Sequence, residues 1–165
     1  LHLASLTGDK AKIMALDIYE SKLEELQKRA NRNQIKSIRT TCVTNTEIIK
    51  SIRANADGLL IDAPCSGIGV MKRNPDAKWL INPDRIKEIL NTQENILQTY
   101  SSLLKKGGEL VYSTCSILPP ENRLQIDNFL NTEQGRDFEF DEDNTYLSHQ
   151  SGFDGFYCAR LIRKM

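Results

Sequence analysis

Three short apolar segments, each ending in a side chain capable of chemistry, constrain the fold of this chain most. Residues 12–17 and 57–62 both end in aspartate, and residues 109–115 end in Cys115. Apolar runs of this length are typical of parallel strands that are buried on both faces. Because helical patterns lie between them, the sequence predicts an α/β sheet that presents these side chains at the carboxyl ends of its strands, where such sheets bind ligands.

Helical and strand spacing place the remaining elements along the chain. The first residues have the pattern of the last turns of a helix closing at Gly8, and the polar segment before the last strand is expected to be a mobile loop. The helix starting at Pro83 or Asp84 has an apolar face that includes Leu103 and Leu104, and it is expected to end at the glycines of residues 107–108. Further helices are predicted over residues 19–33, 44–53 (capped by Thr44 or Asn45) and 123–130, and further strands over residues 35–43, 138–140 and 156–162.

The composition favours one ordinary soluble domain. The 165 residues carry 22 Lys and Arg against 22 Asp and Glu, so the chain lacks the strongly basic charge of many nucleic-acid-binding proteins. No apolar stretch reaches the roughly 18–20 residues of a membrane span and no signal-peptide pattern opens the chain, so a cytoplasmic protein is expected. The 4 cysteines and 2 histidines form no zinc pattern, and we expect reduced thiols and no metal.

Two loops that follow predicted strands each carry a thiol. They are Asp62-Ala63-Pro64-Cys65-Ser66-Gly67 and Thr114-Cys115-Ser116. A buried cysteine in a tight turn is usually an inert small hydrophobic residue, and that alternative stays open for either loop taken alone. Two thiols at equivalent positions of one sheet favour a catalytic site.

These loops and their flanks resemble the Sun/RsmB family of RNA (cytosine-5) methyltransferases, in particular the bacterial branch that acts on 16S ribosomal RNA. The resemblance implies a Rossmann-like α/β methyltransferase sheet with helices on both faces, S-adenosylmethionine as the cofactor and RNA as the partner. It is carried by residues 62–70, 73–79 and 112–122, and it also takes in residues 15–17, 107–108 and 154–161.

The resemblance also implies a covalent mechanism, since C5 of cytosine is too poor a nucleophile to take a methyl group unaided. Cys115 is expected to attack C6 of the ring, and Cys65 to assist release of the methylated product. Asp62 is expected to hydrogen-bond the protonated N3 of an unpaired or flipped base, and it is also a candidate cofactor-binding residue.

Further candidates for ligand binding lie outside the thiol loops. Asp17 ends a predicted strand where related sheets hold the hydroxyls of a ribose, and its alternative role is an ordinary helix N-cap. Lys72, Arg73 and Lys78 are candidates for contacts with RNA phosphates, although on their own they would be an ordinary solvated surface.

The chain departs from the family pattern at two places. Family members begin this domain with a strand and a Gly-rich loop that approaches the cofactor, whereas Gly8 stands alone here. Residues 1–165 are therefore expected to form one partial catalytic domain without that strand, that loop or the upstream RNA-binding region, with an exposed sheet edge through which copies could associate. In addition, no carboxylate stands in residues 39–43 to contact the adenine amino group, and Cys42 or Thr41 would accept only a weaker bond.

Two rival interpretations stay open. A non-catalytic module that binds RNA or protein could keep the same fold, although the presence of both Cys65 and Cys115 argues against it. A methyltransferase that acts on an amino group would need no thiol, so failure to form a covalent adduct with RNA containing 5-fluorocytidine would favour that class.

Overall fold

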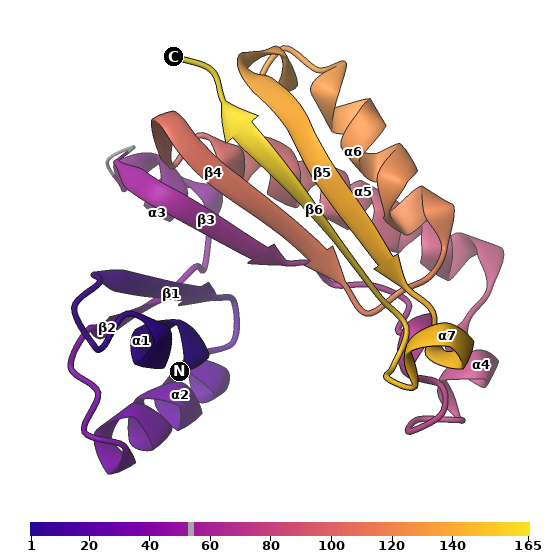
Figure 1. Cartoon of the computed structure of the whole chain (residues 1–165), viewed down its shortest axis with the longest axis horizontal. Coiled ribbons are helices and arrows are strands. Elements are labelled where there is room, and N and C mark those ends of the chain that lie inside the picture. Colours follow the sequence, from indigo (N-terminus) through magenta and orange to yellow (C-terminus); the bar gives the residue numbers. More distant parts are fainter. Residues whose placement is uncertain (53–54) are drawn as a thin grey trace. The chain divides into compact units, whose positions relative to one another are not determined.

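The computed structural model describes residues 1–52 and 55–165, which divide into two compact units after Ile52 (Figure 1). Each unit has its own sheet and its own core. The α/β architecture with sheets flanked by helices confirms the predicted fold class. The expected single domain over residues 1–165 stays a prediction.

The first unit is built on two parallel strands. Strand β1 pairs with β2 from Ile13 opposite Ile38 to Asp17 opposite Cys42. Small residues allow its helices to approach closely, because Ala4 and Ala30 are fully buried against β2. Its elements are α1 (His2–Leu6), β1 (Ile13–Asp17), α2 (Glu20–Arg32), β2 (Ile38–Cys42) and α3 (Thr46–Ser51). These confirm the predicted elements within a few residues.

The predicted cap of α3 is also resolved by the structure. Of the two candidates, Asn45 is the N-cap, and its side chain accepts a hydrogen bond from the backbone N–H of Ile48 at 3.2 Å. The end of this predicted helix, Arg53, lies outside the described residues.

The second unit is a mixed four-stranded sheet in the order β3-β4-β6-β5. Strands β3 and β4 are parallel, whereas β6 runs antiparallel to both β4 and β5. Helices α5 and α6 lie on one face of this sheet (Figure 1). The elements are β3 (Ala56–Asp62), α4 (Ala77–Leu80), α5 (Pro83–Ser101), β4 (Leu104–Thr114), α6 (Arg123–Leu130), β5 (Phe138–Tyr146), α7 (Ser148–Ser151) and β6 (Phe156–Arg163), with short 3₁₀ turns η1 (Ile68–Val70), η2 (Pro119–Glu121) and η3 (Gly135–Asp137).

The core of this unit lies between the sheet and the two long helices. Helix α5 starts with Pro83 at its first turn, and the side chain of Asn82 accepts the backbone N–H of Arg85 at 2.9 Å. The largest apolar side chains that are almost fully buried in this core are Leu97, Leu104, Leu110, Tyr112, Ile126, Phe129, Tyr157 and Leu161.

No helix within residues 1–52 and 55–165 is both long and apolar enough to cross a membrane.

The predicted end of α5 at residues 107–108 is wrong. The helix ends at Ser101, and β4 begins at Leu104. Leu103 and Leu104 continue the helical spacing, but both are buried by tertiary contacts, and the carbonyl of Leu103 accepts the N–H of Ala56 at 3.1 Å. The strand then contains an irregularity in its pairing with β3, which Gly107 permits by adopting a φ of 75°.

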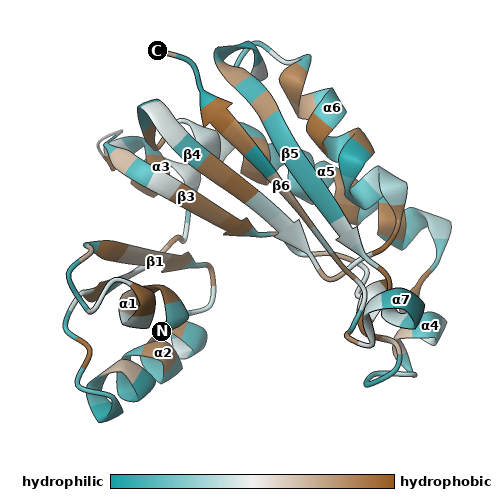
Figure 2. Ribbon diagram, viewed as in Figure 1, coloured by the Kyte–Doolittle hydropathy of each residue, from teal (hydrophilic) through white to brown (hydrophobic). Residues whose placement is uncertain are grey.

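The predicted short strand over residues 138–140 is also longer than expected. Strand β5 continues to Tyr146, and α7 follows it, where a mobile loop was predicted. Figure 2 shows that β5 is hydrophilic along most of its length, whereas β3 is hydrophobic. The strand is held by pairing with β6 and by ion pairs of Arg160 with Asp141 and Glu142, which depend on tertiary structure.

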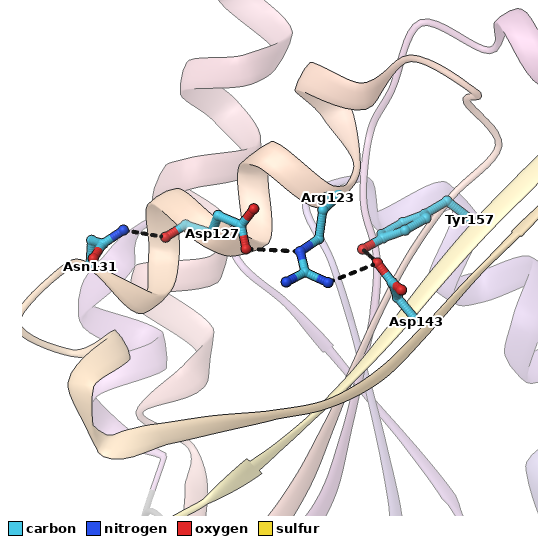
Figure 3. Close-up of polar contacts among 5 residues, drawn as sticks. All are labelled: Arg123, Asp127, Asn131, Asp143 and Tyr157. Atoms are coloured by element: carbon cyan, nitrogen blue, oxygen red, sulfur yellow. Dashed lines mark hydrogen bonds and ion pairs between the residues drawn. The ribbon is translucent and has the colours of Figure 1, made fainter.

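A polar cluster connects the start of α6 to strands β5 and β6 (Figure 3). The guanidinium of Arg123 lies 2.8 Å from Asp127 on its own helix and 3.5 Å from Asp143 on β5. The hydroxyl of Tyr157 on β6 donates to Asp143 at 2.9 Å. Burial, followed by this contact, raises the pKa of Tyr157, so its hydroxyl stays a donor.

We expect Tyr157→Phe to lower the free energy of unfolding by about 1.5–3 kcal/mol, because it removes one hydrogen bond to a charged group. The ring of Tyr157 is buried and its packing is kept, and Asp143 retains Arg123. Urea denaturation followed by circular dichroism measures the change. The matched control is Tyr146→Phe, which removes a hydroxyl from a half-exposed ring at the end of β5. Equal stability of the two variants would contradict this role of the cluster.

Candidate active site

The two thiol loops start at the same edge of the second unit's sheet. Strands β3 and β4 are parallel, and Asp62 pairs with Ser113 in their register. The loop after Asp62 and the loop after Thr114 therefore begin side by side, as predicted. They bring the Sγ atoms of Cys65 and Cys115 to 3.1 Å from each other.

The two cysteines form a hydrogen-bonded pair of free thiols. A disulfide would require about 2.05 Å between the sulfur atoms. Both side chains are half-buried. The hydrogen bond from Cys65 lowers the pKa of Cys115 to about 7, whereas the same contact and burial raise the pKa of Cys65. At neutral pH about half of Cys115 would therefore be thiolate, with Cys65 as its protonated partner.

Asp62 stands exposed at the end of β3, beside the thiol pair. Its carboxylate has no hydrogen-bond or ion-pair partner among the described residues, so its oxygens are available to a ligand. Its negative charge acts against ionisation of the nearby Cys115 thiol. The structure therefore brings Asp62, Cys65 and Cys115 together, as the sequence predicted.

Close backbone contacts hold the Cys65 loop in place. The N–H of Gly69 in η1 donates to the carbonyl of Cys115 at 3.0 Å, and the carbonyl of Gly69 accepts the N–H of Gly155 at 2.8 Å. A Cβ atom on Gly69 would lie 2.1 Å from the carbonyl oxygen of Gly155. Only glycine allows these three segments to approach so closely.

Sequence reasoning missed the buried polar residues beneath the two loops. Glu121 and Asn122 are almost fully buried, although sequence reasoning placed them only in the segment 112–122 that carries the family resemblance and gave them no role of their own. Glu121 accepts hydrogen bonds from Ser66 and Ser116, and the amide of Asn122 donates to the carbonyl of Ser116 at 2.9 Å. No short-range pattern in the sequence marks the burial of these two side chains.

The candidate phosphate-binding residues are exposed, but two of them have protein partners. Arg73 forms an ion pair with Asp154, and the ammonium of Lys78 lies 4.8 Å from the ring centroid of Trp79, whose side chain is 78% exposed. Lys72 has no ion-pair partner among the described residues. A role of the three residues in RNA binding stays a prediction.

Comparisons with known proteins decide the family. The family model described as 16S rRNA methyltransferase RsmB/F matches residues 1–162. The chain belongs to this family. It is 39% identical over 157 residues to the ribosomal RNA small subunit methyltransferase B of Proteus mirabilis, covering 94% of this chain and 36% of that protein.

Solved structures share the fold of this chain. The structure titled PH0851 has a TM-score of 0.88 at 30% identity and covers 97% of this chain and 39% of that one. NSun6 from Pyrococcus horikoshii with SFG has a TM-score of 0.87 at 22% identity, covers 99% of this chain and 44% of that one, and shows the same fold. The chain thus spans somewhat more than a third of these relatives.

S-adenosylmethionine is the cofactor that membership of the RsmB/F methyltransferases indicates. In the first unit, Asp17 ends β1, and its Oδ1 accepts the N–H of Tyr19 at 2.9 Å while its Oδ2 lies 3.8 Å from Lys22. The N-cap of α2 is Tyr19, so the alternative role of Asp17 as N-cap is wrong. The carboxylate is half-buried and its Oδ2 is only loosely held, so it could still accept a ribose hydroxyl, and this role stays a prediction.

The predicted weak adenine contact at Cys42 faces a competing bond. The thiol of Cys42 donates to the carbonyl of Ile18 at 3.6 Å, so only the weak acceptor capacity of its sulfur remains for an amino group.

Among residues 1–52 and 55–165, no group of three or more histidine, cysteine, aspartate or glutamate side chains is arranged to hold a metal ion.

Proposed function

We propose that this chain is the part of a ribosomal RNA methyltransferase that activates C5 of a cytosine, in 16S ribosomal RNA, through a covalent bond to Cys115. The observation that carries the proposal is the pair of thiols 3.1 Å apart, one of them with a pKa lowered to about 7. A methyltransferase acting on an oxygen or an amino group has no need of a thiolate held ready by a second thiol. A ribosomal RNA substrate also favours a cytoplasmic location.

The proposed reaction begins with attack by Cys115. Its thiolate forms a bond to C6 of the ring, and the electrons of the C5–C6 double bond move into the ring, which makes C5 nucleophilic. Asp62, exposed beside the pair and without a protein partner in the described part of the chain, would pass a proton from solvent to N3 during the addition and take it back when Cys115 leaves. The base must be unpaired or flipped out to reach this edge.

Asp17 is the residue that would hold the ribose of S-adenosylmethionine, and the cofactor would supply the methyl group that C5 takes up. Loss of the C5 proton to a base then restores the C5–C6 double bond and expels Cys115. Cys65 assists this step, because its thiol stays protonated and stabilises the departing thiolate through the same contact that exists in the free protein. Lys72, Arg73 and Lys78 would bind phosphates of the RNA strand, which makes binding sensitive to salt.

The test uses RNA containing 5-fluorocytidine. A base can remove hydrogen from C5 but cannot remove fluorine, so the release of Cys115 is blocked and the adduct is trapped. Since the chain covers 36% of the Proteus mirabilis relative, it is assayed alone and in a chimera in which it replaces the matching segment of that relative. With S-adenosylmethionine present, we expect a stable RNA adduct on Cys115, identified by mass spectrometry. Cys115→Ser should abolish the adduct, whereas Cys65→Ala, which removes the donor to the departing thiolate, should keep the adduct and slow turnover.

Two outcomes would overturn the proposal. Methylated RNA without any adduct, in the chimera and in its Cys115→Ser variant alike, would place the chain among methyltransferases with another acceptor. Binding of RNA by the chimera without methylation, unaffected by Cys115→Ser, would favour the non-catalytic interaction module.

A further inference from the structure

A buried carboxylate lies between the two thiol loops and contacts both. Glu121 belongs to the 3₁₀ turn η2 and is 0% exposed. Its Oε2 accepts the backbone N–H of Ser66 at 2.7 Å, and its Oε1 accepts the hydroxyl of Ser116 at 2.9 Å. Burying a carboxylate is costly unless it is hydrogen-bonded, so a side chain in this place requires a specific reason.

The partners of Glu121 are the residues next to the thiols. Ser66 directly follows Cys65, and Ser116 directly follows Cys115. The hydroxyls of Ser66 and Ser116 also lie 3.3 Å from each other. The side chain of Glu121 thus links the two serines that follow the thiols. Along the chain, Glu121 lies 55 positions from Ser66 and 5 from Ser116.

The turn that carries Glu121 is itself anchored. The hydroxyl of Tyr112, in the core of β4, donates to the carbonyl of Glu121 at 2.8 Å. From α5, the amide of Gln93 donates to the carbonyl of Pro64 at 2.9 Å and lies 3.5 Å from Oε2 of Glu121. The carboxylate is therefore a fixed point to which the loops attach.

We propose that Glu121 is a positioning residue, which sets the contact between Cys65 and Cys115 by accepting hydrogen bonds from Ser66 and Ser116. It touches neither thiol, and it acts by holding the loops that carry them. Only the use of the resulting thiolate in RNA methylation rests on the proposed function; the positioning of the thiols does not.

The charge of Glu121 cannot explain its presence. Negative charges on Asp62 and Glu121 both oppose ionisation of Cys115, whereas the hydrogen bond from Cys65 favours it more strongly. The benefit of Glu121 is therefore geometric. Two substitutions separate geometry from charge, because Glu121→Gln keeps the shape and can still bond both serines, whereas Glu121→Ala removes both attachments.

The experiment measures the rate of reaction of Cys115 with an aromatic disulfide reagent as a function of pH, with mass spectrometry to assign the site. Cys42→Ser and Cys158→Ser provide a background without the other two thiols. We expect Glu121→Ala to raise the apparent pKa of Cys115 and to slow its reaction at pH 7 about 5-fold. Glu121→Gln is expected to stay within about 2-fold of the unmodified protein, with its apparent pKa unchanged or slightly lower.

A second variant covers the case in which Glu121→Ala does not fold. Ser116→Ala removes the attachment of the Cys115 loop alone and is expected to raise the apparent pKa in the same direction by a smaller amount. The control for lost stability is Phe129→Leu, which loosens the packing of Phe129 against Phe138, away from the thiols, and should leave the pH profile unchanged.

Two results would overturn the proposal: an unchanged pH profile in folded Glu121→Ala or Ser116→Ala, or a shift of equal size in Phe129→Leu. Failure of the proposed function gives a different pattern. If Cys115 reacts as expected in all variants while the chimera forms no RNA adduct, the positioning role stands and the methylation proposal falls.

Discussion

Replacing Cys65 with alanine should raise the pKa of Cys115 from about 7 back toward its ordinary value of 9.0, because the hydrogen bond from Cys65 is the largest cause of the lowering. At pH 7 the thiolate fraction of Cys115 would fall from about one half to about 1%. A thiolate of higher pKa is intrinsically more nucleophilic, so the rate constant of the thiolate itself rises about 8-fold over this range of pKa. The rate of reaction with an aromatic disulfide should therefore fall about 6-fold at pH 7.

The same argument predicts that the order of the rates reverses at high pH. Above about pH 10 both proteins carry the Cys115 thiolate, and Cys65→Ala should then react faster because its thiolate is the more basic. A rate curve that crosses that of the parent protein distinguishes a change of pKa from a change of access to the thiol. Both rate curves are measured in proteins that also carry Cys42→Ser and Cys158→Ser.

Cys65→Ser is the matched control, because a hydroxyl can still donate to the Cys115 thiolate at nearly the same position. It should keep most of the lowered pKa, and its rate at pH 7 should lie between those of the parent and Cys65→Ala. If Cys65→Ala and Cys65→Ser behave alike and both match the parent, the contact between the sulfur atoms does not control the reactivity of Cys115.

The thiol pair could be predicted from the sequence because it depends on short-range patterns. The apolar runs before Asp62 and Cys115 indicate buried parallel strands, and parallel strands bring their carboxyl ends to one edge. The register of β3 and β4 realises this arrangement, with Asp62 opposite Ser113. Loop position followed from strand direction alone, and no side-chain contact was needed to infer it.

Glu121 could not be recognised in the same way, because its role exists only in the folded chain. Its partner Ser66 lies 55 positions away, and the bond uses a backbone N–H that no sequence pattern marks. Prolines before Glu121 predict a helix start equally well whether the carboxylate points into solvent or into the core. Likewise, the part of β5 beyond residue 140 has the composition of a polar loop, and its strand becomes evident only from its pairing with β6 and from the ion pairs of Arg160.

The second large effect is expected for Gly69→Ala, which should destabilise the second unit by about 3 kcal/mol and also remove the lowered pKa of Cys115. The new Cβ would lie 2.1 Å from the carbonyl oxygen of Gly155 and 2.7 Å from that of Cys115. Both are backbone atoms that cannot rotate away, so the segments must separate. Separation weakens the backbone hydrogen bonds from Gly69 to Cys115 and from Gly155 to Gly69. These two bonds hold the Cys65 loop in position.

Urea denaturation measures the stability of Gly69→Ala, and the pH profile of disulfide exchange reports on Cys115. Gly58→Ala is the matched control, since its new Cβ would have the carbonyl oxygen of Glu109, at 4.0 Å, as its nearest neighbour. That variant should match the parent or gain up to about 1 kcal/mol, because alanine restricts the unfolded chain. If Gly69→Ala instead kept both the parent's stability and its thiol profile, the three backbone segments would not meet as described, and the fixed geometry on which Cys115 depends would need another source.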